Sequence, residues 1–163
     1  MRRDSIYAVR YVSSKLFSFT HRARKVVKNV ENDGYWLGAN MNYGPTDRLS
    51  LNVPLFHCFG CVLGVMACIN HGVTMVICEV FDPVKVMTSI ETEKCTSVYG
   101  VPTMFISILE HKLFNKFDFS SLRTGIMAGS PCPIKSMEEV VEKMNMKEIT
   151  IVYGLTEASP GMT

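Results

Sequence analysis

Short apolar segments alternate with longer helix-like segments along most of the chain, and this alternation constrains the fold most strongly. Residues 73–78 are continuous and rich in β-branched side chains, as in strands that are buried on both faces. Segments of similar character follow at 96–101, 122–127 and 149–152. Because helix-like segments separate them, the sequence predicts an α/β fold with a mostly parallel sheet and flanking helices.

Turn and capping residues set the limits of the first predicted helices. Residues 60–71 are apolar nearly all round and are followed by Gly72, a good C-terminal stop for a buried helix. Asp82 and Pro83 predict an N-cap followed by proline at the first helical position. We expect that helix to end near Lys94.

Two further helices are predicted from Pro102 onward. The first begins at Pro102-Thr103, directly after a predicted strand, and the second covers residues 133–146. The second helix is amphipathic. Its expected apolar side consists of Ile134, Met137, Val140, Val141 and Met144.

Composition limits the classes of function. The 163 residues are 47% hydrophobic, enough for one ordinary domain core, and the net charge of +2 gives no reason to expect a nucleic-acid partner. The longest apolar stretch, 58–69, is shorter than the roughly 20 residues that a membrane span requires. Six cysteines without a secretory signal predict free thiols and an intracellular location, cytoplasmic or mitochondrial.

The first residues differ in composition from the rest. Residues 1–27 are rich in arginine, lysine and serine with a single acid, Asp4. The pattern superficially resembles a mitochondrial transit peptide, but we favour a divergent basic segment that is poorly ordered. The domain itself is expected over residues 28–163.

Two loops that follow predicted strands have the composition of ligand sites. Residues 128–133 lead from a strand into a helix, whose first backbone N–H groups could face a ligand. Residues 153–157 combine an aromatic ring, a glycine, a hydroxyl and a carboxylate, which suit a nucleotide phosphate and its metal ion. The alternative for both loops is an ordinary strand-to-helix turn.

Several segments resemble motifs of the AMP-forming synthetase superfamily. YGLTE at 153–157 looks like its Tyr-Gly-x-Thr-Glu motif, and LRTGIMAGSPCP at 122–133 resembles its adenine loop. VPLFHCFG at 53–60 is similar to its aromatic-histidine segment, GVPTMF at 100–105 to the turn near its acyl pocket, and NDGYWLG at 32–38 also matches. The resemblance covers residues 28–163 in the family's order and is closest to medium-chain fatty acyl-CoA synthetases. It implies part of the family's large N-terminal domain.

The resemblance also implies roles for individual residues. It implies catalytic roles for Thr156, Glu157 and His57. Thr156 would form a hydrogen bond with the α-phosphate, and Glu157 would coordinate Mg²⁺. The adenylate site would comprise Gly129, Ser130, Pro131, Tyr153, Gly154 and Thr156, with Tyr153 stacked on adenine. The acyl substrate would contact Phe56, His57, Val101, Pro102 and Gly129.

The implied reaction joins a fatty acid to CoA. ATP first adenylates the carboxylate, with Mg²⁺, and CoA then forms the thioester. The family's glycine-rich phosphate loop has no counterpart before Gly34, and its C-terminal lysine has none after Glu157. We therefore expect this chain to be incompetent alone and to self-associate through exposed apolar surface; the alternative is a non-catalytic nucleotide- or acyl-adenylate-binding remnant or pseudoenzyme.

Two other chemistries fit the residues less well. Cys58-x-x-Cys61 beside His57 invites a zinc or redox hypothesis, but no second well-spaced pair follows, and buried thiols are the simpler interpretation. A serine hydrolase would need Gly-x-Ser-x-Gly, whereas the glycine after Gly129-Ser130-Pro131 is missing.

Overall fold

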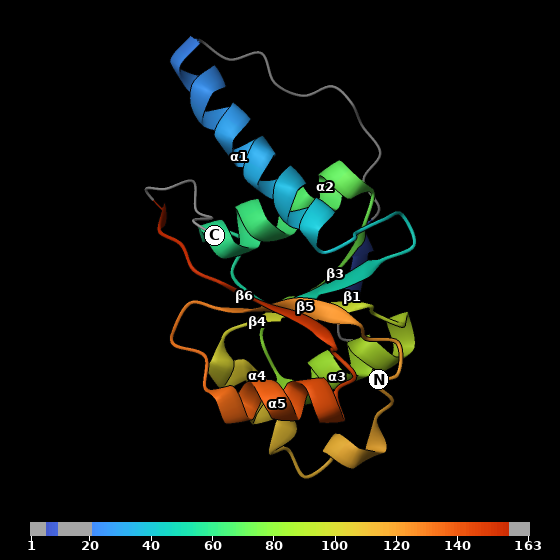
Figure 1. Ribbon diagram of the computed structural model, residues 1–163. Coiled ribbons are helices and arrows are strands. Elements are labelled where there is room, and N and C mark those ends of the chain that lie inside the picture. The colour runs from blue at the N-terminus through green and yellow to red at the C-terminus, as the bar shows by residue number, and fades with distance from the viewer. Residues whose placement is uncertain (1–5, 10–20, 157–163) are drawn as a thin grey trace.

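A computed structural model describes residues 6–9 and 21–156 of the chain, and Figure 1 shows their arrangement. The elements, in order, are β1 (Ile6–Val9), α1 (His21–Asn40), β2 (Arg48–Leu51), η1 (Phe59–Met66), α2 (Ala67–His71), β3 (Thr74–Cys78), α3 (Pro83–Glu93), β4 (Ser97–Gly100), α4 (Pro102–Leu109), η2 (Phe114–Lys116), β5 (Thr124–Ala128), α5 (Ile134–Lys143) and β6 (Glu148–Val152).

One six-stranded sheet, in the order β1-β3-β2-β4-β5-β6, forms the centre of the molecule. The strands from β2 to β6 pair in parallel, and β1 pairs antiparallel with β3 at one end of the sheet. This arrangement confirms the predicted α/β class with a mostly parallel sheet. The carboxyl ends of the parallel strands therefore meet along one edge, where ligands bind in such sheets.

Helices cover both faces of the sheet (Figure 1). α1, η1 and α2 lie on one face, while α3, α4 and α5 lie on the other. Each face has its own apolar core. The first core includes Leu49, Leu51, Phe59, Leu63, Tyr99 and Ile126, and the second includes Val76, Met87, Ile90, Phe105, Ile108 and Met127. Burying each large side chain stabilises the fold by roughly 1.5–3 kcal/mol, so the two cores hold the strand ends in place.

Local sequence signals explain most helix boundaries. Asp82 caps α3, since its Oδ1 accepts a hydrogen bond of 2.9 Å from the backbone N–H of Lys85. α3 ends at Lys94, and α2 ends at Gly72, where each C-cap residue adopts the left-handed conformation. These three predictions are confirmed, as are the strands expected around 73–78, 96–101, 122–127 and 149–152.

Other features differ from expectation or were not predicted. The helix expected over 60–71 is divided into η1, which is wound as a π-helix, and α2. The helix expected over 133–146 is shorter, since α5 ends at Lys143. Its expected apolar side is only partly buried: Val140 and the C-cap residue Met144 are in the core, whereas Ile134, the first residue of the helix, is 78% exposed. α1 runs through residues 27 and 28, where the domain boundary was expected.

A polar network joins the amino ends of three strands, β2, β5 and β6. The Arg123 guanidinium donates to both carboxylate oxygens of Asp47, at 3.2 and 2.9 Å, and to Glu148 Oε2 at 3.0 Å. It also donates to the backbone oxygens of Met41 and Asn42. This network ties the starts of β2, β5 and β6 together at the edge opposite the candidate site, which helps to fix the relative positions of their carboxyl ends.

Candidate functional site

A pocket of about 60 Å³ opens at the carboxyl edge of the sheet. Its lining residues come from η1 and the residues before it, from the end of β5 and from the end of β6. They are His57, Cys58, Phe59, Leu63, Ala128, Gly129, Val152 and Gly154. Because Ala128 and Val152 are paired in register, the loops after β5 and β6 begin side by side. The two loops predicted as ligand sites therefore border one pocket.

His57 occupies a tight turn before η1. Its backbone N–H donates to Pro54 O at 3.1 Å, and a Cβ on Gly60 would lie 2.3 Å from that same oxygen, so the turn requires glycine. The ring Nδ1 accepts a 3.1 Å hydrogen bond from the backbone N–H of Phe59. In the neutral ring the proton must then be on Nε2, which makes Nε2–H a donor on the ring edge turned away from the backbone.

Cys58 also lines the pocket, and sequence reasoning did not assign it to the site. Its Sγ lies 3.5 Å from Thr156 Oγ1 and 3.7 Å from His57 Nδ1. Its position next to His57 could have indicated a place in the site. Its contact with Thr156, however, joins residues 98 positions apart, and no sequence pattern reveals such a contact. The thiol joins the loop before η1 to the loop after β6.

Gly129 begins the loop after β5 with a backbone conformation that favours glycine. Its φ is +88°, and a Cβ there would lie 3.1 Å from Val101 Cγ1. Ser130 and Pro131 follow it and are exposed. The absent side chain lets a ligand approach the backbone at the end of β5.

The loop after β6 presents polar and aromatic groups to solvent. Tyr153 is 61% exposed, Gly154 lines the pocket and Thr156 is exposed. A largely exposed phenol ring supplies a flat apolar face, the shape on which a purine base stacks. Glu157, the predicted metal ligand, lies outside the described residues.

Comparison with known proteins identifies the family. A family model described as "AMP-binding enzyme" matches residues 17–163, nine-tenths of the chain. The chain belongs to the AMP-binding enzymes. The family predicted from the sequence motifs is therefore confirmed.

Individual relatives agree with this assignment. YngI of Bacillus subtilis is 48% identical over 161 residues, which are 99% of this chain and 29% of YngI. The mitochondrial medium-chain acyl-CoA ligase ACSF2 of Bos taurus is 38% identical over 136 residues, 83% of this chain and 22% of ACSF2. Among solved structures, the N-terminal domain of FACL13 from Mycobacterium tuberculosis aligns with a TM-score of 0.67 at 25% identity, covering 80% of this chain and 32% of FACL13.

The chain spans less than a third of the length of these curated relatives. Within residues 6–9 and 21–156, no helix combines the length and apolar character that crossing a bilayer demands. In the same part of the chain, no three His, Cys, Asp or Glu side chains are grouped closely enough to hold a metal ion.

Three predicted acyl-site residues do not line the pocket. Phe56 precedes His57 in the chain and is 94% exposed, and it is absent from the pocket lining. Val101 and Pro102 lie at the start of α4, where Val101 contacts the position that a Gly129 side chain would take. The structure thus brings His57, Gly129 and Gly154 together at the pocket and leaves Phe56 outside.

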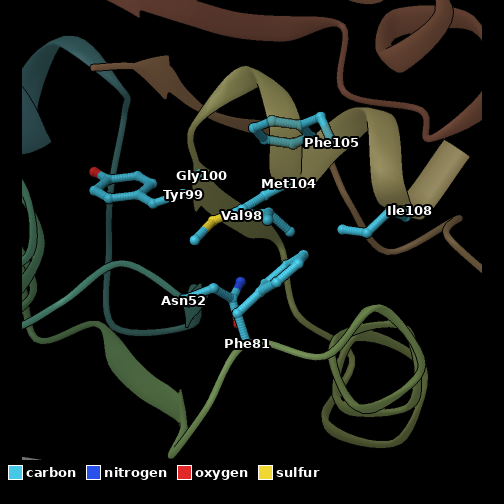
Figure 2. Close-up of a pocket in the computed structure, with 8 residues that line it drawn as sticks. All are labelled: Asn52, Phe81, Val98, Tyr99, Gly100, Met104, Phe105 and Ile108. Atoms are coloured by element: carbon cyan, nitrogen blue, oxygen red, sulfur yellow. The ribbon is translucent and has the colours of Figure 1, made fainter. Parts of the chain in front are cut away.

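A second, narrow space lies beside the end of β4 (Figure 2). It is lined by Asn52, Phe81, Val98, Tyr99, Gly100, Met104, Phe105 and Ile108. Figure 2 shows Phe81 and Met104 extending into it, and the space that remains is too narrow for a water molecule. Two of its side chains carry polar groups, and both groups are hydrogen-bonded. The Asn52 amide donates to Ser50 O at 3.2 Å and to Ser50 Oγ at 3.1 Å, and the Tyr99 hydroxyl donates to Met41 Sδ at 3.3 Å. This AMP-binding enzyme therefore fills that space with its own apolar core.

Proposed function

We propose that this chain forms part of the acyl-adenylate site of an ATP-dependent fatty acid–CoA ligase. The observation that carries the proposal is the pocket between His57, Gly129 and Gly154, with Tyr153 and Thr156 exposed directly beside it. The family assignment and the name of ACSF2 support a carboxylic acid as the substrate.

Different residues of the site would contact different parts of the adenylate. Tyr153 would stack on adenine, while Gly129, Ser130, Pro131 and Gly154 would offer backbone close to the nucleotide. The Thr156 hydroxyl would donate to an α-phosphate oxygen, and hydrogen bonds of this charge-assisted kind are the stronger class. This arrangement would hold the adenylate by stacking and by directed donors.

His57 would serve the acyl end of the same ligand. Its Nδ1 is occupied by the Phe59 N–H, so Nε2–H is the group that can donate to the carboxylate or to the acyl carbonyl. A neutral donor there would orient the acid without forming an ion pair. Phe56, Val101 and Pro102 would border the acyl chain only if the ligand extends beyond the pocket.

This chain spans less than a third of its curated relatives, so the complete ligase reaction is proposed for a protein of their full length. Adenylation of a fatty acid by ATP would release pyrophosphate, and CoA would then displace AMP to form the thioester. Glu157 would hold Mg²⁺, which would neutralise phosphate charge when bound. We propose an intracellular, cytoplasmic or mitochondrial, location, which the mitochondrial label of ACSF2 supports.

Binding of a non-hydrolysable acyl-adenylate mimic tests the proposal directly. Tyr153→Ala should weaken binding at least fivefold, because stacking of a base on an aromatic ring contributes about 1–3 kcal/mol. Calorimetric titration of the purified chain measures this. Turnover assays with fatty acid, ATP and CoA then separate a binding remnant from an enzyme.

Tyr35→Ala is the matched control, since Tyr35 is an exposed tyrosine on α1 that does not line the pocket. It should leave the affinity unchanged. Equal losses in both variants, or no saturable binding by a chain with a cooperative melt, would contradict the proposed site.

A further inference from the structure

Cys58 lies where two separate parts of the site meet. Its Sγ is 3.5 Å from Thr156 Oγ1, which follows β6, and 3.7 Å from Nδ1 of its neighbour His57. The thiol is free and partly exposed, and it lines the pocket. A cysteine at this point contacts two side chains to which the proposed function gives hydrogen-bonding roles, His57 and Thr156.

The available protons decide which way these hydrogen bonds run. His57 Nδ1 already accepts the N–H of Phe59 at 3.1 Å, a shorter contact than its 3.7 Å approach to Sγ. The Thr156 hydroxyl has one proton to donate and two lone pairs to accept with. A phosphate oxygen can only accept, so a bound phosphate takes the hydroxyl proton and leaves Oγ1 as an acceptor.

We infer that Cys58 is a positioning residue, which donates its S–H to Thr156 Oγ1 and so directs the Thr156 hydroxyl proton toward a phosphate oxygen of the bound nucleotide. This inference rests on the proposed function, in which Thr156 contacts that phosphate. No covalent step is involved, because the thiol acts through Thr156. Cys58 lies outside both of the loops, 128–133 and 153–157, that the sequence predicts as ligand sites.

Simple packing is the competing explanation, and side-chain replacements separate the two. Cys58→Ser keeps a donor at nearly the same position, whereas Cys58→Val keeps an apolar side chain of similar size without one. If Cys58 acts only by packing, Cys58→Val should preserve nucleotide affinity better than Cys58→Ser. If Cys58 acts as a hydrogen-bond donor, Cys58→Ser should preserve it better.

The experiment titrates the full chain with AMP and, separately, with adenosine, by calorimetry. Cys58→Val is expected to weaken AMP binding about three- to tenfold, the range expected for one hydrogen bond, and to leave adenosine binding unchanged. Cys58→Ser should remain close to wild type for both ligands. Cys61→Val is the control, because Cys61 is a partly exposed thiol on η1 that does not line the pocket.

A double-mutant cycle tests the coupling itself. In a Thr156→Val background, Cys58→Val should cause no further loss of AMP affinity, since the group it positions is gone. Additive losses would overturn the inference, as would a Cys58→Ser variant as weak as Cys58→Val. Equal weakening of AMP and adenosine binding would show a packing role and would also overturn it.

A second readout does not depend on nucleotide binding. Alkylation of Cys58 by iodoacetamide, followed by mass spectrometry, should be faster in Thr156→Val than in wild type, while Cys61 is alkylated at the same rate in both. Equal alkylation rates of Cys58 in Thr156→Val and in wild type would show that Thr156 does not contact the thiol, and would overturn the inference. Faster alkylation in a folded chain that binds no AMP would instead contradict the proposed function and leave the contact standing.

Discussion

Asp47 lies just before β2 and receives hydrogen bonds from three sides. Arg123 donates to both of its carboxylate oxygens, the Thr96 hydroxyl donates to Oδ1 at 2.6 Å and the Gly44 N–H donates to Oδ2 at 2.9 Å. Burial by itself raises the pKa of Asp47, but the hydrogen bonds from Arg123 and Thr96 outweigh burial, so the pKa lies below its ordinary value. The ionised carboxylate is therefore the form that the fold stabilises.

This direction predicts the pH dependence of stability. A carboxyl group with a lower pKa in the folded chain stabilises the fold above its unfolded pKa, about 4, and loses that contribution as the pH falls through the folded value. Asp47→Asn should lower the free energy of unfolding by about 2 kcal/mol at pH 7, because it removes charged hydrogen bonds. It should also flatten the loss of stability below pH 4, measured by urea unfolding at several pH values.

Glu142→Gln, at an exposed position on α5, is the charge-matched control and should change neither the stability at pH 7 nor its slope in acid. A wild-type acid profile retained in Asp47→Asn would mean that other carboxyl groups carry the dependence.

At the scale of elements, α1 packs against η1 and α2 through glycine. A Cβ on Gly38 would lie 2.2 Å from Cδ2 of His71, and one on Gly34 would lie 2.6 Å from Cβ of Met66. The His71 ring forms a 2.9 Å hydrogen bond between Nε2 and the Tyr35 carbonyl oxygen and stacks on the Tyr35 ring. The helices approach this closely because both α1 positions lack side chains.

Gly38→Ala is expected to destabilise the fold by about 1–3 kcal/mol, the cost typical of inserting a methyl group into a packed contact. The melting temperature should fall, and the fluorescence of Trp36, the one tryptophan of the sequence, should report any displacement of α1. Gly44→Ala is the control, since a Cβ at Gly44 has no neighbour within 4 Å. Adding His71→Ala to Gly38→Ala should recover part of the loss; no recovery would show that the contact with His71 is not the cause.

Elements with strong local signals were predictable from the sequence, and the rest depended on distant contacts. α3 has Asp82 and Pro83 at its start, and β3 is a continuous β-branched run, so each carries its own evidence. β2 is only four residues long, begins with Arg48 and follows a turn, so its burial between β3 and β4 leaves no periodic pattern. The π-helical winding of η1 was equally hidden, because its apolar sequence also suits an α-helix.

The candidate site divides in the same way. The loops at 128–133 and 153–157 were predicted because each directly follows a strand, and parallel pairing of β5 with β6 brings them together. Cys58 and its contact with Thr156 could not be predicted, since the contact arises only when the whole sheet has assembled.

At the scale of the whole molecule, β6 is the last strand of the sheet and carries exposed apolar side chains. Ile151 is 53% exposed on β6, and Tyr153 and Leu155 follow it at 61% and 50%. An exposed apolar edge strand is a template for pairing with another chain. We therefore expect the isolated chain to form oligomers in a concentration-dependent manner.

Analytical ultracentrifugation over a range of concentrations measures this association. Ile151→Lys should shift the distribution toward monomer, because a charge on the edge strand opposes pairing. Val80→Lys is the control, as Val80 is a comparably exposed apolar residue outside the β6 edge. A monomer at every concentration, with a cooperative melt, would contradict the expectation.

The position of the loop after β6 has a thermodynamic consequence. Within the described residues, β6 ends the sheet, and the same strand leads to Tyr153 and Thr156, so edge pairing and nucleotide binding would act on one structural unit. If a neighbouring strand steadies that loop, occupancy of the edge raises nucleotide affinity, and nucleotide strengthens edge pairing by the same factor, because such couplings are reciprocal. Affinity in this chain would then be a function of protein concentration, and a single dissociation constant would describe it only at a stated degree of assembly.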